Sequence, residues 1–364
     1  MPTELKNRTQ SLLSLCVGYF AFYVATGVAV KYFLSPAQKG YPGFDDVTYL
    51  VYSTIGGTLL CLAVVIFRKW YRLNDASSTS LGISKEVLIL IPSGVCTAVV
   101  IPTTTLMYTL PISVMVAMVI MRGAIIIVSR LVDALQSYQG ILQKKVSWEE
   151  NIAVVVALLA VGLKIFWVGN DGKNHFAFLE SRPAMVILGA YVLAYSVRIY
   201  LMNYFKNTGS LQKVDNRVFF GIEQVVAAIT LLIAGTFLYF SSWDLAQVQQ
   251  FQKALSTPPP MWSLAILSGT AFGMVAFFSV FIFMYRGRTA TFAGLVNRLT
   301  SLIAGTASTL VVWAVFGGRL PSLEDWASFV LILVAVALLY RAELKYRGQA
   351  KPIVLPRSLP AVPA

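Results

Sequence analysis

The chain has few of the residues that carry metal, redox or acid–base chemistry. Its 364 residues include one histidine, His175, and three cysteines, Cys16, Cys61 and Cys96. Each cysteine lies inside an apolar run, and their spacing matches neither a metal site nor a disulfide framework. The sequence also lacks a Gly-rich nucleotide loop and a His/Asp cluster. We therefore expect no metal, no cofactor and no catalytic residues, and the chain is not predicted to be an enzyme.

Charged residues are also scarce. They make up 12% of the chain, against 57% hydrophobic residues, and the mean hydropathy is +0.71. Soluble domains carry about 25% charged residues. Apolar runs of about 20 residues recur along nearly the whole length, which is the pattern of a helical protein that crosses a bilayer many times.

Ten membrane spans are predicted, and their orientation follows from the Lys and Arg residues. With both termini in the cytoplasm, the inner segments hold 18 of these residues and the outer loops hold 5. The net charge of +13 is thus a topology signal, and no nucleic-acid partner is expected. The predicted spans are about 11–33, 47–67, 87–108, 110–131, 151–169, 184–203, 217–240, 261–284, 289–316 and 323–342.

Two segments outside the spans have patterns of their own. In the outer segment 241–260, apolar residues fall on one face of a short helix at the membrane surface, ended by three prolines. The face comprises Trp243, Leu245, Val248, Phe251 and Leu255. The proline-rich tail 348–364 is predicted to be disordered. Short loops suit a bacterial cytoplasmic membrane, and an organelle membrane remains open.

The chain contains an internal repeat. Residues 146–165 align with residues 321–340 at a constant offset of 175, and each copy opens with a serine and two acids, which suit a helix N-terminus. Arg122 lies 25 residues before the serine of its copy, and Arg298 lies 24 before its own. A weaker similarity links Gly18–Tyr23 with Gly189–Tyr195. Because each copy would hold five spans, the two copies must be inverted, as in many secondary transporters.

The wording of the repeat resembles a known family. MVIMRGAIIIVSRL, followed by a basic loop and WEENIAVVVALLAVGLKI, is similar to the drug/metabolite transporter superfamily, in its chloroquine-resistance-like and nucleotide-sugar-transporter-like branches. The resemblance implies an all-α fold with five-helix repeats at 1–170 and 183–347. It also implies a central cavity lined by spans one to four and six to nine. Spans five and ten would be peripheral, and a homodimer is expected through Ile152–Leu163 and Phe329–Leu339, faces that equally suit lipid.

Two arginines near the middle of spans are the main candidates for a binding site. An arginine at the bilayer centre costs roughly 3 kcal/mol or more, so Arg122 and Arg298 should face other helices or a wet cavity. In an inverted repeat they would converge near the midplane, where two guanidinium groups suit phosphate or carboxylate. The alternative is that each binds backbone carbonyls or a buried acid and serves structure or gating.

Other intramembrane polar residues extend this candidate site. Arg198 is a further candidate for binding substrate. Glu223 is the one acid clearly inside a predicted span; it is expected to pair with Arg198 or Arg298, and a role in proton coupling stays open. Gly269 and Gly273 form a small-xxx-small pair typical of close helix packing. The lining is predicted to include Tyr19, Tyr23, Thr104, Tyr195 and Asn297.

These features favour a secondary transporter that moves a small organic anion or phosphate-bearing metabolite by alternating access, with exchange as one mode. The alternative is a proton-coupled carrier or exporter of amino acids, nucleobases or amphipathic drugs, with Glu223 as the coupling group. A distant alternative is a membrane enzyme that modifies lipids, which the scarcity of histidine and clustered acids disfavours.

Overall fold

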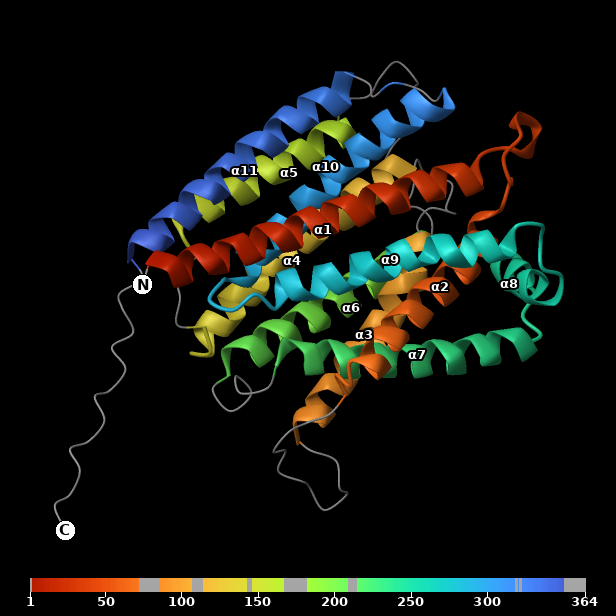
Figure 1. Ribbon diagram of the computed structural model, residues 1–364, viewed down its shortest axis with the longest axis horizontal. Coiled ribbons are helices and arrows are strands. Elements are labelled where there is room, and N and C mark those ends of the chain that lie inside the picture. The colour runs from red at the N-terminus through yellow and green to blue at the C-terminus, as the bar shows by residue number, and fades with distance from the viewer. Residues whose placement is uncertain are drawn as a thin grey trace, which may run out of the picture.

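The structure is a computed structural model that describes residues 2–71, 85–106, 114–142, 146–166, 182–208, 215–317, 320 and 323–349. These residues form eleven α-helices and one 3-10 helix, with no strand among them (Figure 1). The helices are α1 (Pro2–Leu34), α2 (Asp46–Phe67), α3 (Lys85–Leu106), α4 (Val114–Tyr138), α5 (Trp148–Phe166), α6 (Arg182–Asn207), α7 (Asn216–Phe240), α8 (Ala246–Ser256), α9 (Trp262–Phe283), α10 (Ala290–Phe316) and α11 (Leu323–Gln349), with the 3-10 helix η1 at Ala37–Lys39.

The chain is a multi-pass helical membrane protein, as its composition predicts. Among the described residues, seven helices are long and apolar enough to cross a bilayer, namely α1, α2, α6, α7, α9, α10 and α11. In α3 the apolar stretch is shorter, Leu88–Thr104. Each of the ten predicted spans overlaps one long helix. That all ten cross the membrane, and that they form a repeat, remain predictions.

The long helices lie side by side in one bundle (Figure 1). In it α1 packs against α9 and α10, α2 against α9, α3 against α6 and α7, α4 against α5, α6 and α10, and α5 against α11. We call the end where α1 begins and α11 finishes the inner end, following the Lys and Arg prediction. The opposite end, where α8 lies, is the outer end.

Helix starts are fixed by side chains that bond free backbone N–H groups. The Asp45 carboxylate accepts from Thr48 N at 2.8 Å, and the Thr289 hydroxyl accepts from Phe292 N at 3.0 Å. At α5, Ser147 accepts from Glu150 N at 3.2 Å, which confirms the predicted cap of the first repeat copy. Its counterpart, Ser322, lies outside the described residues, as does the predicted disordered tail from 350 onward. The α11 helix includes the first two residues assigned to that tail.

The outer segment contains the predicted short helix, α8, which ends before the three prolines. Val248 and Ala254 are its buried residues, while Leu245 and Leu255 are exposed. The Tyr52 hydroxyl donates to the Ala254 carbonyl at 2.5 Å, so α8 is held on α2. Its inward face therefore includes Ala254 and excludes Leu245 and Leu255, which the apolar pattern alone had placed there.

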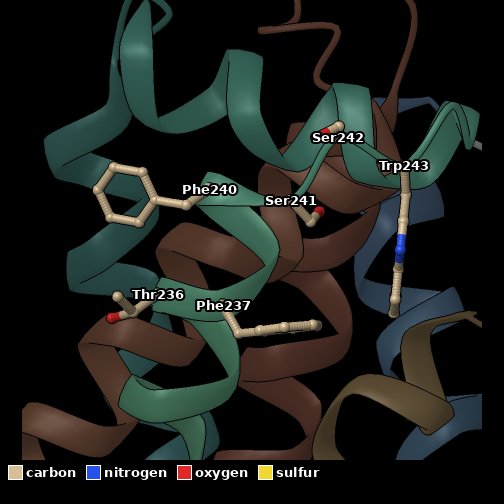
Figure 2. Close-up of a pocket in the computed structure, with 6 residues that line it drawn as sticks. All are labelled: Thr236, Phe237, Phe240, Ser241, Ser242 and Trp243. Atoms are coloured by element: carbon tan, nitrogen blue, oxygen red, sulfur yellow. The ribbon is translucent and has the colours of Figure 1, made fainter.

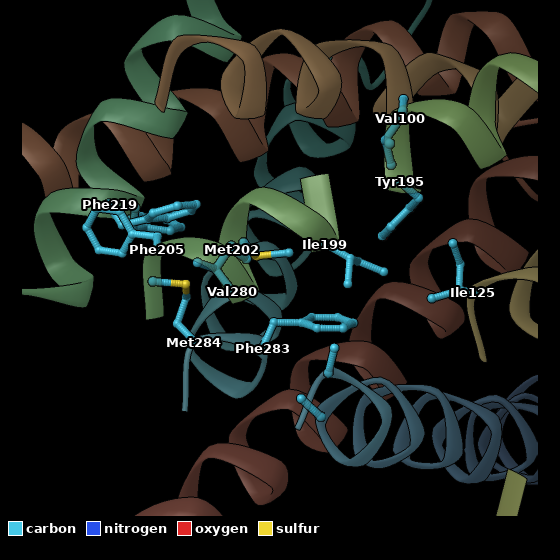
Figure 3. Packing of buried hydrophobic residues seen from close by; sticks show 14 of the residues in the cluster. Val100, Ile125, Tyr195, Ile199, Met202, Phe205, Phe219, Val280, Phe283 and Met284 are labelled. Carbon is cyan, nitrogen blue, oxygen red and sulfur yellow. The ribbon is translucent and has the colours of Figure 1, made fainter. Parts of the chain in front are cut away.

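The core divides into two main clusters of buried side chains. The larger one joins α3, α4, α6, α7 and α9 through aromatic and aliphatic residues such as Ile125, Ile199 and Phe219 (Figure 3). The second joins α5 and α11, where Ala153, Ala157 and Ala335 are fully buried. The residues Ile152, Val155, Leu159, Val330 and Val334 are exposed. Part of each surface predicted for a homodimer is thus used within one chain, and the dimer remains a prediction.

Glycines allow α2 and α9 to approach at backbone distance. A Cβ on Gly273 would lie 2.6 Å from the Gly57 carbonyl oxygen, and one on Gly269 would clash with the Ser53 carbonyl. This contact confirms the predicted close packing at this glycine pair. On α2, a Cβ at Gly56 would collide with the carbonyl oxygen of Ile266.

We expect Gly56→Ala to lower the free energy of unfolding by about 1–3 kcal/mol, because backbone atoms of α9 cannot move aside without separating the helices. Gly189→Ala on α6 is the matched control. A Cβ there meets nothing within 4 Å, so stability should hold or rise by up to about 1 kcal/mol. Thermal unfolding in micelles would measure both variants, and equal stability of the two would contradict the packing argument.

Candidate functional site

Arg298 of α10 lies in the interior with part of its guanidinium group unpaired. The residue is 7% exposed, and its Nε and Nη2 atoms have no hydrogen-bond partner among the described residues. Its guanidinium carbon lies 4.9 Å from the ring centroid of Tyr195 on α6, a cation–π distance. A buried cation without an acid is costly unless another group neutralises it. Arg298 is therefore suited to receive an anion.

Arg122 of α4 occupies a comparable environment beside α1. It is 8% exposed, its Nη2 donates to the Tyr23 hydroxyl at 3.3 Å, and its guanidinium carbon lies 5.9 Å from that ring centroid. Tyr19, one turn earlier on α1, is within electrostatic reach of both Arg122 and Arg298. The structure thus gathers the two predicted arginines around one tyrosine.

A short chain of polar contacts fixes Tyr19. Its hydroxyl donates to Asn297 Oδ1 at 3.4 Å, and Asn297 Nδ2 donates to the Ser279 hydroxyl of α9 at 3.0 Å. Tyr19, Asn297 and Ser279 are all buried. The predicted site residue Asn297 therefore holds a tyrosine in place beside the arginines.

Arg198 differs from the other two arginines because it has an acidic partner. Its Nε and Nη2 atoms donate to the two carboxylate oxygens of Glu223 at 2.8 and 3.1 Å. Glu223 is fully buried and also accepts from Ser93 at 2.7 Å and Thr97 at 3.1 Å. Of the two pairings considered for Glu223, the geometry has the one with Arg198. The charge of Arg198 is thereby compensated within the protein.

Thr104 has a local role in this structure. Its hydroxyl donates to the Val100 carbonyl, one turn back in α3, at 2.7 Å. Intrahelical bonds of this kind are common for hydroxyls in membrane helices. Thr104 is the one predicted lining residue whose contact does not support a place beside the arginines.

The two grooves found on the described part of the protein lie away from the arginines. One, of about 450 Å³, is at the outer end beside Phe237, Phe240 and Trp243 (Figure 2). The other, of about 570 Å³, lies between α4 and α6 along Leu131, Leu135 and Val197. The predicted open central cavity is not among them. Arg122 and Arg298 are instead closed in by the neighbouring helices.

Sequence reasoning missed the most extensively bonded acid of the bundle. Asp133, near the end of α4, is fully buried and accepts from the backbone N–H groups of Ala290 and Thr291 at 2.8 and 2.6 Å. Asn203 of α6 also donates to it at 3.3 Å. Its position at the end of an apolar run was the available signal, but a residue there usually reaches water.

Comparison with known proteins supports the fold alone. No protein-family model and no curated relative matches the sequence. A solved structure, described only as a crystal structure of a protein, is similar over 93% of this chain and 99% of its own length, with 16% identity and a TM-score of 0.54. The helical arrangement described above is therefore shared with a protein of known structure.

Proposed function

We propose that the chain is a secondary transporter for small organic anions that works by alternating access. The observation that carries this proposal is the unpaired, buried guanidinium of Arg298 among tyrosines at the centre of a helical membrane bundle. A carboxylate or phosphate bound there would supply the missing acceptors for Nε and Nη2. An anion would also compensate the charge while the site is closed to water.

An inverted repeat of ten spans is the second part of the proposal, and the contacts of the two arginines support it. Arg122 and Arg298 lie 176 residues apart, and each guanidinium lies over a tyrosine, Tyr23 and Tyr195, which lie 172 residues apart. The tyrosine one turn earlier in each helix has the same relation. The Tyr19–Tyr23 and Tyr191–Tyr195 ring centroids are 5.5 and 4.9 Å apart, at interplanar angles of 55° and 57°.

Helix packing supports the repeat as well. Under it α1 corresponds to α6, α3 to α9 and α4 to α10. Accordingly, α1 packs against α9 and α10, while α6 packs against α3 and α4. The resemblance to the drug/metabolite transporter superfamily, with repeats at 1–170 and 183–347, agrees with this arrangement. Membership of that family is part of the proposal.

The competing carrier, with Glu223 coupling transport to protons, has less support. Four donor contacts from three side chains fix this carboxylate between α3, α6 and α7. A coupling carboxylate has to exchange its proton with water during the cycle. We therefore assign Glu223 to structure.

Exchange through the purified protein tests the proposal. Proteoliposomes preloaded with one organic anion should take up a labelled anion, and the panel should include monocarboxylates, phosphorylated metabolites and nucleotide-sugars. Amino acids, nucleobases and cationic drugs form the comparison set. Uptake or thermal stabilisation by the comparison set alone would exclude an anion carrier, whereas exchange of any anion class that competes with the others would support it.

A further inference from the structure

At the inner end, Asp133 joins three helices. Both of its carboxylate oxygens accept from the first two backbone N–H groups of α10, those of Ala290 and Thr291. Asn203 of α6 donates to the same carboxylate. A carboxylate at a helix N-terminus gains from the positive end of the helix dipole as well as from the hydrogen bonds. Because Asp133 belongs to α4, it ties α4 to α10 and α6.

Neighbouring contacts hold the same turn between α9 and α10. The Thr289 hydroxyl donates to Glu150 of α5 at 2.7 Å, and Arg288 donates to Glu343 of α11 at 2.5 Å. Lys206 of α6 donates to the Phe283 carbonyl at 3.1 Å. All of these side chains are buried. The start of α10 is thus closed against α4, α5, α6 and α11.

The outer end has a contact at the corresponding positions. Lys31 of α1 donates to the Thr309 hydroxyl of α10 at 2.7 Å. Thr309 follows Asp133 by 176 residues, and Asn203 follows Lys31 by 172, the same two spacings that relate the arginines and the tyrosines. One turn away, a Cβ on Gly27 would lie 2.7 Å from the Ser308 hydroxyl oxygen, so α1 and α10 are also closely packed.

We propose that the Asp133–Asn203 and Lys31–Thr309 contacts are the two gates of the protein, closing the arginine site at the inner and the outer end. The proposal rests on alternating access, the proposed function. It explains why Arg122 and Arg298 are buried, since both gates are closed in this structure.

The two gates differ in strength. Opening the inner one breaks charged hydrogen bonds to two backbone N–H groups that have no intrahelical partner. Opening the outer one releases a lysine and a hydroxyl, and Thr309 also donates to the Gly305 carbonyl in its own helix at 2.9 Å. We infer that the empty protein opens more readily to the outside.

Side-specific thiol labelling tests the gates without any substrate. In a chain whose three native cysteines are replaced, Ser301→Cys puts a thiol in the interior of α10, one turn from Arg298. A membrane-impermeant maleimide is then applied from one side of oriented vesicles. Asp133→Ala should raise the labelling rate from the inner side roughly ten- to a hundredfold, the range expected for losing one charged hydrogen bond or more. Thr309→Val should raise the rate from the outer side by a smaller factor.

Two features keep the outcome decisive. If Asp133→Ala does not fold, Asn203→Leu removes one donor and leaves the acid on α10, and it should raise inner-side labelling a few-fold. Folded variants whose labelling is unchanged, or an Asp133 variant that opens the outer side, would overturn the gate assignment. Labelling as expected in a protein that exchanges no anion would keep the gates and reject the cargo. Anion exchange with unaltered labelling would do the reverse.

Discussion

Replacing Arg298 with glutamine is expected to weaken anion binding at least a hundredfold. The two free N–H groups at Nε and Nη2 would otherwise form charged hydrogen bonds with the ligand. Such bonds contribute about 1.5–3 kcal/mol each, and about 2.8 kcal/mol corresponds to a hundredfold change in affinity. Arg122→Gln should have a smaller effect, because the Arg122 guanidinium already donates to the Tyr23 hydroxyl.

The sign of the stability change separates a binding role from a structural one. An unneutralised buried cation destabilises the empty protein, so Arg298→Gln should leave its melting temperature unchanged or raise it. Binding is measured by thermal shift and by equilibrium binding of the labelled anion. Arg130→Gln is the matched control, since Arg130 bonds Asn151 near the end of α4. A destabilised Arg298→Gln variant that still binds the anion would make Arg298 a structural residue.

Much of the fold follows from local sequence features. Apolar runs of span length gave the positions of the ten long helices, and Ser147 with Glu150 gave the start of α5. Hydropathy does not reveal which face of a short amphipathic helix meets its neighbours. The inward face of α8 is decided by Tyr52, which bonds the Ala254 carbonyl from another helix.

The site was predictable in kind but not in its pairing of charges. Arginines in the middle of apolar runs mark a functional or structural centre by their cost alone. Whether each has an acid depends on contacts between helices far apart in the sequence, such as Arg198 with Glu223, 25 residues later. Asp133 was overlooked for the same reason, because its partners are backbone groups of a helix that begins 157 residues later.

Closure of the site is also a property of the assembled bundle. The sequence resemblance implies a central cavity, but Arg122 and Arg298 are buried in this structure. A cavity that exists in one state of a carrier has no sequence pattern of its own, since the same side chains line it when open and pack together when closed. The polar contacts at the two ends show where such a change would have to begin.

Removing the Glu223 carboxylate is expected to lower the free energy of unfolding by about 3–5 kcal/mol, the range measured when one partner of a buried ion pair is lost. Glu223→Ala would leave Arg198 buried without an acid and would also remove the acceptor of Ser93 and Thr97. Because these donors lie on α3 and α6, the loss should loosen α7 from both helices. Thermal or denaturant unfolding in micelles measures the change.

The double variant Glu223→Gln/Arg198→Met distinguishes a structural pair from a coupling group. Replacing both partners removes the unpaired charge, so the double variant should be more stable than Glu223→Ala, and the two substitutions should be strongly non-additive. If Glu223 has only this structural role, Glu223→Gln should keep the pH dependence of uptake while losing stability. A variant of native stability whose uptake no longer depends on pH would instead identify Glu223 as the proton-coupling group and reject its assignment to structure.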